Sequence, residues 1–65
     1  EWVAFHEAVE NLPDEAREVF NLTWYEGLSQ EEIGEVLGLS VRTVKRRWQA
    51  ARCQLYETLD GEPPS

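Results

Sequence analysis

Five of the six basic residues of this chain lie in one short segment, LSVRTVKRRWQAAR at residues 39–52. The five are Arg42, Lys45, Arg46, Arg47 and Arg52. No acidic residue interrupts them, unlike a helix surface built for ion pairs between successive turns. Arginine and lysine bind phosphates and the edge of guanine, and glutamine, present here as Gln49, pairs with adenine. The segment therefore carries the residue types that contact nucleic acid, although a merely solvated charged face is the simpler interpretation.

The rest of the chain is acidic. Residues 1–38 hold ten acidic residues and one basic residue, a net charge of −9, whereas residues 39–59 have a net charge of +4. The formal net charge of the whole chain is −7, which by itself argues against nucleic acid. Salt screens charges beyond about 8–10 Å, so at contact range the local patch outweighs the total. The basic residues are thus concentrated in one segment of a chain that is acidic overall.

Length and residue types exclude most other classes of function. A chain of 65 residues forms one small domain, so an enzyme with a deep pocket is not expected. No catalytic constellation, metal-ligand set or phosphate-binding loop is present, and no cofactor is expected. The single cysteine, Cys53, fits a reducing compartment, and without a long apolar run the expected location is the cytoplasm. The absence of Met and a start already in helical rhythm indicate a piece of a longer protein.

Four helices with short connections are predicted, with no strand pattern and no repeat. Their boundaries follow from apolar spacing, from proline at a helix start, from side-chain caps and from glycine at helix ends. The first helix has its apolar face over residues 2–12, the second runs from Pro13 to Gly27, the third from the capping box SQEE at 29–32 to Gly38, and the fourth from Ser40 to about Leu59.

A tight turn around Gly38 joins the third and fourth helices, and this arrangement is typical of a helix-turn-helix. The predicted fold class is all-α. It is a four-helix helix-turn-helix domain, with the three-helical core of winged-helix-like DNA- or RNA-binding domains but without the wing. The domain is expected to span residues 1–59, and residues 60–65, DGEPPS, are expected to form a disordered tail.

On a helical wheel, the fourth helix separates a buried stripe from an outward basic face. The stripe consists of Val44, Trp48, Ala51, Leu55 and Leu59. Helix-turn-helix proteins contact bases with the N-terminal part of this helix, so the candidate base contacts are Arg42, Lys45, Arg46 and Gln49. The candidate contacts to the DNA backbone, or braces of the helix, are Ser40, Thr43, Arg47 and Arg52.

The segment LPDEAREVFNLTWYEGLSQEEIGEVLGLSVRTVKRRWQAAR, residues 12–52, resembles region 4 of bacterial sigma factors, most of all the extracytoplasmic-function (ECF) group. The shared features are a Leu-Pro start, REVF, EGLS-EEI and LG-S--TVK-R---AR. The resemblance implies a domain that binds the −35 element of double-stranded promoter DNA and docks on the β flap of RNA polymerase. It also implies that an anti-sigma factor holds many members. The family domain that binds the −10 element is not in this sequence, so this piece is not expected to initiate transcription alone.

Three positions depart from the family pattern. Gly34 stands where Ala is usual, which predicts a helix that is either loose or closely approached by another segment. Trp48 stands where Leu or Ile is usual. Ala50 stands where a basic residue is frequent, which removes one side chain that the resemblance would assign to DNA.

Two alternative functions remain open from the sequence. The DNA-binding output domain of a LuxR-type response regulator shares EGLS-EEI and TVK, but the RRWQAAR that follows here favours a sigma factor. A protein-interaction module would instead use the basic helix to bind an acidic partner such as an anti-sigma factor. His6 is expected on the surface, Cys53 as a bystander thiol, and Trp2, Trp24 and Tyr25 at the edge of the core. Trp24 lies off the main apolar stripe, so a partner-docking surface is its other interpretation.

Overall fold

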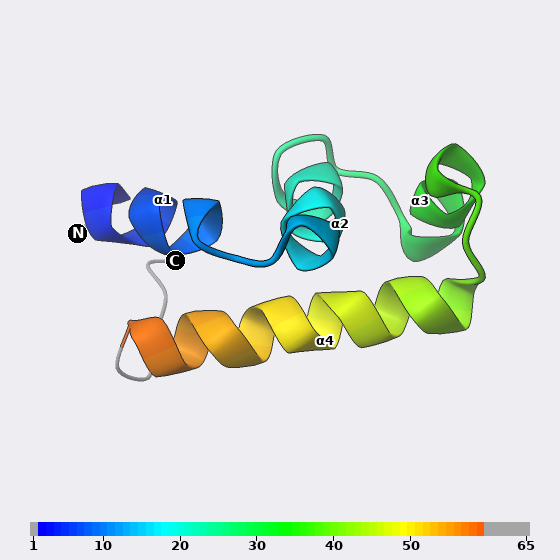
Figure 1. Cartoon of the computed structure of the whole chain (residues 1–65). Helices are drawn as coiled ribbons and strands as arrows, with labels where there is room; N and C mark the ends of the chain where they lie inside the picture. The colour runs from blue at the N-terminus through cyan, green and yellow to red at the C-terminus, as the bar shows by residue number, and fades with distance from the viewer. Residues whose placement is uncertain (1, 60–65) are drawn as a thin grey trace.

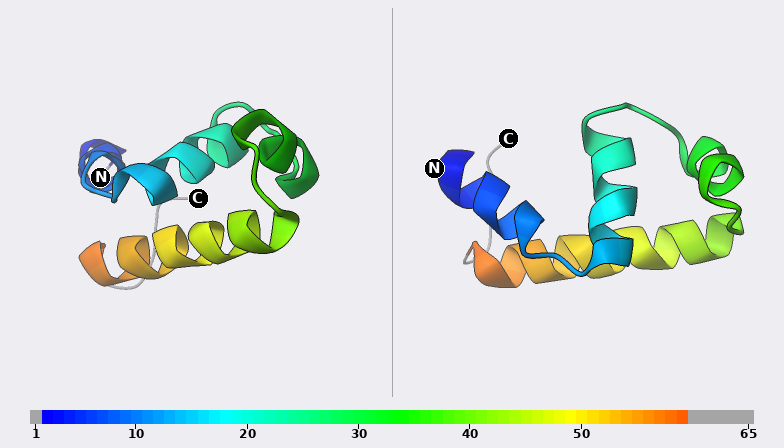
Figure 2. Two further views of the ribbon diagram at one scale, coloured as in Figure 1. Left: turned by 45° about the vertical axis from the view of Figure 1, so that its right-hand side comes forward. Right: turned by 45° about the horizontal axis from the view of Figure 1, so that its top comes forward.

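Four α-helices form the part of the chain that the computed structural model describes, residues 2–59, and no strand occurs among these residues. The helices are α1 (Trp2–Glu10), α2 (Asp14–Trp24), α3 (Gln30–Leu37) and α4 (Val41–Thr58). Helix α4 is the longest, and α1, α2 and α3 are arranged one after another along one side of it (Figure 1). Two further views show the same arrangement (Figure 2). The prediction of an all-α helix-turn-helix domain is confirmed, while the predicted tail at residues 60–65 lies outside the described residues.

The helix-turn-helix is delimited by the caps that the sequence predicts. The Ser29 Oγ accepts a hydrogen bond from the Glu32 N–H at 3.1 Å, and the Ser29 N–H donates to the Glu32 carboxylate at 2.8 Å. Gly38 ends α3 with a φ of 69°, a conformation that costs other residues free energy because of their Cβ. The Ser40 Oγ then accepts from the Thr43 N–H at 3.2 Å and starts α4. Local chemistry thus specifies both ends of the turn.

The ends of α2 differ from the prediction. Pro13 is the N-cap rather than the first helical residue, and its carbonyl accepts the first backbone hydrogen bond from Arg17. The helix ends at Trp24, not at Gly27. The chain turns at Gly27, whose φ is 70°, and the Leu28 N–H returns to a carbonyl of α2. The glycine therefore shapes the turn that follows the helix instead of stopping the helix itself.

The core consists of two clusters along the inner side of α4. The larger one joins α1, α2 and the second half of α4 and contains Phe5, Ala8, Val9, Leu12, Ala16, Phe20, Ala51 and Leu55. The smaller one, under the helix-turn-helix, contains Val19, Ile33 and Val44. Trp48 packs against both clusters. The predicted stripe of α4 is confirmed, with Val44, Ala51 and Leu55 buried and Trp48 and Leu59 partly buried.

A close approach of the backbone explains the glycine at position 34. A Cβ built on Gly34 would lie 2.6 Å from the Leu39 carbonyl oxygen. The same turn is closed by a hydrogen bond of 2.8 Å from the Leu39 N–H to the Gly34 carbonyl. Of the two alternatives left by the sequence, the structure therefore shows the closely approached helix. Val36, which belongs to the apolar residues of the same helix, is 64% exposed and takes no part in the core.

Candidate nucleic-acid interface

Four exposed residues in the N-terminal half of α4, Arg42, Lys45, Arg46 and Gln49, are here called the basic face. All four residues are exposed, whereas Val44, on the opposite side of the same turns, is fully buried. Packing against α2 and α3 fixes the rotation of α4, because the buried stripe must face those two helices. The basic face is thus presented to solvent as a consequence of core packing.

The cations of the basic face are not neutralised by any carboxylate that the structure describes. Within residues 2–59, Arg42, Lys45 and Arg46 form no ion pair. Arg17 is paired instead, with Asp14 at 2.9 Å and with Glu10 at 3.7 Å, and Arg47 is paired with Glu15. In the described part of the chain, three neighbouring cations thus have no carboxylate partner despite the excess of acidic residues. The charge is available to a ligand that brings negative charge of its own.

The start of α4 offers backbone donors beside the basic face. Ser40 is exposed, and its hydroxyl both accepts from the Thr43 N–H and donates to the Thr43 Oγ1 at 3.0 Å. The Ser40 side chain is therefore engaged in capping. The first N–H groups of a helix have no partner within the helix and lie at the positive end of its dipole. These groups, more than the Ser40 hydroxyl, can receive a phosphate oxygen.

The two remaining arginines of α4 lie on its flanks and have different surroundings. The Arg47 Nη2 donates to the Glu15 carboxylate of α2 at 3.4 Å, and the Arg47 side chain is only 26% exposed. This contact links α4 to α2, and bracing the helix is one of the two roles that the sequence left open for Arg47, beside a contact to the DNA backbone. Arg52 is exposed and lies at an aromatic pocket between α1, α2 and α4. The structure thus places Arg47 in an ion pair with α2, whereas Arg52 also lines a surface hollow together with Gln49 of the basic face.

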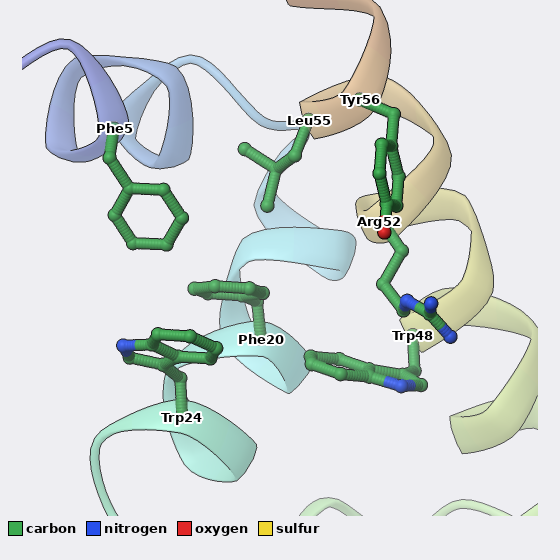
Figure 3. Close-up of a pocket in the computed structure, with 7 residues that line it drawn as sticks. All are labelled: Phe5, Phe20, Trp24, Trp48, Arg52, Leu55 and Tyr56. Atoms are coloured by element: carbon green, nitrogen blue, oxygen red, sulfur yellow. The ribbon is translucent and has the colours of Figure 1, made fainter. Parts of the chain in front are cut away.

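The aromatic pocket is built on a stack of three rings. Phe20 is stacked between Trp24 and Trp48, with centroid distances of 5.5 Å on both sides. Figure 3 shows this stack, with the other residues that line the pocket, Phe5, Leu55, Tyr56 and Arg52, drawn above it. Trp24 is 44% exposed and Tyr56 is 42% exposed, so the pocket opens to the surface.

Sequence patterns identified this pocket only in part. Trp24 was marked as lying off the apolar stripe of its helix, but Tyr56 was not singled out. The sequence did contain a signal for Tyr56. It is an aromatic residue that lies outside the buried stripe of α4, on the flank that also carries Arg52. The contact of Glu15 with Arg47 has no signal in the sequence, because the two residues are 32 positions apart.

Two further residues lie as the sequence predicts. The His6 Nδ1 and the Tyr25 hydroxyl share a surface hydrogen bond of 2.9 Å, which ties α1 to the residue after α2. Cys53 is an exposed free thiol. Among residues 2–59 there is no group of His, Cys, Asp and Glu side chains that could hold a metal ion. No helix in that part of the chain is both long and apolar enough to cross a membrane.

A capped turn between two helices, followed by a cationic face with no ion pair to residues 2–59, is typical of helix-turn-helix domains of the DNA-binding class. Comparison with known proteins narrows this class. Residues 2–55 match the family described as "Sigma-70, region 4". The chain belongs to this family, and it is a region 4 domain of the ECF type.

Two relatives agree with this assignment. The chain is 39% identical over 59 residues, 91% of its length, to the RNA polymerase sigma factor SigZ of Bacillus subtilis. It is 44% identical over 52 residues, 80% of its length, to the ECF RNA polymerase sigma factor SigE of Mycolicibacterium smegmatis. The matched segments cover 34% of the first relative and 20% of the second, so the chain spans about a third of the one and a fifth of the other. No solved structure matches the chain.

The family assignment decides between the interpretations that the sequence left open. Region 4 is a non-enzymatic DNA-binding domain of transcription factors, in line with the prediction that the chain is not an enzyme. The matches favour a sigma factor over the output domain of a response regulator and over a module that binds only protein.

Proposed function

We propose that this chain is the domain of an ECF-type sigma factor that binds the −35 element of a promoter while docked on RNA polymerase. The observation that carries the proposal is the basic face, which is cationic, exposed and without ion pairs to any of residues 2–59, in a chain of net charge −7. Its position at the start of the second helix of a helix-turn-helix matches the part of such helices that enters the major groove. Because promoter DNA and polymerase share the bacterial cytoplasm, that is the proposed location.

Each residue of the basic face has a role that its chemistry suits. Arg42, Lys45 and Arg46 would donate to guanine O6 and N7, and Gln49 would pair with adenine. The N–H groups at the start of α4, with Thr43, would hold a backbone phosphate and fix the depth of the helix in the groove. Ser40 supports them as the cap that keeps those N–H groups in place.

The net negative charge of the chain explains why docking on polymerase would strengthen its binding to DNA. A net charge of −7 opposes the approach of DNA phosphates, so the isolated chain is expected to bind DNA weakly. Attachment to a polymerase that already holds the promoter raises the effective concentration of the domain at its site, to the millimolar range for short connections. We propose the β flap of RNA polymerase as the attachment point and the aromatic pocket as the surface that receives it.

Selection of bound duplexes from a randomised DNA library, at low salt, tests the DNA-binding half of the proposal. Enrichment of one asymmetric motif, with an affinity that falls steeply as salt increases, supports promoter binding by a monomer. Enrichment of a palindrome bound by a dimer would support a response-regulator output domain instead. If no duplex is enriched while an acidic protein partner such as an anti-sigma factor binds, the basic helix serves protein recognition.

A further inference from the structure

We propose that Val41, the first residue of α4, is a further specificity-determining residue, which contacts the C5 methyl group of a thymine in the major groove. Recognition of the promoter would then depend on one apolar contact beside the polar contacts of the basic face. The inference rests on the proposed binding to promoter DNA and deepens it, because it states which base the start of α4 requires.

Val41 lies at the beginning of a row of side chains on the surface of α4. Residues four positions apart in a helix are neighbours on its surface, so Val41, Lys45 and Gln49 follow one another along one row. Arg42 and Arg46 form the adjacent row in the same way. All five side chains are exposed. Val41 therefore extends the basic face at the end of the helix that helix-turn-helix proteins use to contact bases.

Neither core packing nor helix stability accounts for a valine at this position. One exposed apolar side chain is ordinary on a protein surface, but Val41 is 42% exposed and belongs to neither core cluster of residues 2–59. The first turns of α2 and α3 each carry two acidic residues, which suit the positive end of the helix dipole, whereas the first turn of α4 carries none. A β-branched side chain also loses rotamer freedom in a helix. The valine is thus better explained by a contact outside the domain.

The second exposed apolar residue of α4 belongs to a different surface. Besides Val41, the large apolar residue that α4 exposes is Tyr56, which lines the aromatic pocket. Tyr56 follows Val41 by 15 residues, so the two lie about 22 Å apart along the helix axis. A partner in the aromatic pocket therefore does not cover Val41, and the neighbours of Val41 on the surface of α4 are the cations of the basic face.

The C5 methyl group of thymine is the apolar group that the major groove presents. The side chains of the basic face donate hydrogen bonds to base edges, and none of them ends in an apolar group that could cover a methyl group. Valine has two methyl groups on a short, stiff side chain and no polar atom. Contact between a valine and a thymine methyl group removes apolar surface of both from water, which is favourable. A G·C or C·G pair offers no methyl group, so valine favours thymine at its position.

Replacement of thymine by deoxyuridine tests the inference, because deoxyuridine lacks only the C5 methyl group. Each thymine of the selected duplex is replaced in turn, and binding of the 65-residue chain is measured by fluorescence anisotropy at the low salt of the selection. We expect one replacement to weaken binding of the unsubstituted chain about fourfold, the effect of one methyl group lost from an apolar contact. Val41→Ala should weaken binding to the unmodified duplex to a similar degree and should not respond further to that replacement.

Val36→Ala is the matched control. It makes the same deletion on an exposed valine of α3, which is 64% exposed and lies outside the basic face. Its affinity for the duplex and its response to deoxyuridine should equal those of the unsubstituted chain. Unchanged helical circular dichroism in both variants ensures that the comparison is between folded chains.

The possible results separate this inference from the proposed function. If the chain binds a selected duplex but no thymine responds to the loss of its methyl group, promoter binding stands and the role of Val41 is wrong. The same conclusion follows if the responding thymine affects Val41→Ala as strongly as the unsubstituted chain, or if Val36→Ala loses the response as well. If the chain selects no duplex, the inference fails together with the DNA-binding half of the proposed function.

Discussion

The Gly34 Cα and the Leu39 carbonyl face each other so closely that a Cβ at position 34 would lie 2.6 Å from the carbonyl oxygen. Real Cβ atoms are not found at that distance from a backbone oxygen, and this oxygen belongs to the turn that leads into α4. The turn, and with it the start of the basic face, is therefore set by the absence of a side chain in α3.

Gly34→Ala is the first prediction. Alanine is favoured over glycine inside a helix by about 1 kcal/mol, but overpacking against a fixed group costs about 1–3 kcal/mol. We expect the clash to prevail and the substitution to lower the free energy of unfolding by about 1–2 kcal/mol, seen as a lower Tm in thermal circular dichroism. Glu35→Ala, on the exposed side of the same helix, is the matched control and should change little. A higher Tm for Gly34→Ala would show that the turn relaxes at no cost.

Removal of one guanidinium from the basic face should change sequence preference. Arg46→Ala is expected to cost about 1–3 kcal/mol of DNA-binding free energy and to relax the preference at one base position. Arg17→Ala removes the same charge from α2, where the arginine is paired with acidic residues, and should leave the preference intact. Fluorescence anisotropy with a series of single-base variants of the duplex measures both effects. An equal loss on all duplexes would make Arg46 a phosphate contact.

The ion pair between Arg47 and Glu15 leads to a prediction about salt dependence. An arginine already paired with a carboxylate of its own chain releases no counterion on binding DNA, so Arg47→Ala should leave the salt slope unchanged. Because Glu15 is exposed, the loss of the pair should cost the fold no more than about 1 kcal/mol. Titrations of DNA at several salt concentrations provide the slope. A slope reduced by about 0.9 would assign Arg47 to a phosphate after all.

Two substitutions of Ser40 separate its effect on helix capping from its effect on phosphate binding at the start of α4. Ser40→Ala loses the side-chain cap and should destabilise the chain by about 0.5–2 kcal/mol. Ser40→Asp keeps a capping oxygen, and its charge suits the helix dipole, so stability should be retained. The same negative charge repels a phosphate at the helix start, so DNA binding should weaken in Ser40→Asp. Equal DNA affinity of Ser40→Asp and the unsubstituted chain would place the phosphate elsewhere.

The ring stack should be the most sensitive part of the core. Phe20→Ala removes a ring that contacts Trp24 and Trp48, at an expected cost of about 3–5 kcal/mol, which is enough to unfold most chains of this length at 25 °C. Val36→Ala deletes apolar atoms of a mostly exposed side chain and should cost a few tenths of a kcal/mol. Ellipticity at 222 nm and urea denaturation distinguish the two. A folded Phe20→Ala variant would mean that the tryptophans close over the space.

Local patterns in the sequence determined much of this structure. The capping box at Ser29, the left-handed Gly38 and the cap at Ser40 are contacts between residues at most four positions apart, so the residue types and their spacing specify them. The stripe of α4 follows from helical periodicity in the same way, and it placed the basic face on the outside. The family resemblance, carried by residues 12–52, was confirmed by the match over residues 2–55.

Contacts between distant segments were decided by the tertiary structure alone. The pairing of Glu15 with Arg47 and the assembly of one pocket from Phe5, Trp24 and Tyr56 depend on how α1 and α2 cross α4. The choice between a loose and a closely approached Gly34 needed the position of the Leu39 carbonyl. Helical periodicity fixes which way a side chain points from its own axis, but only the packing of the helices decides what it meets there.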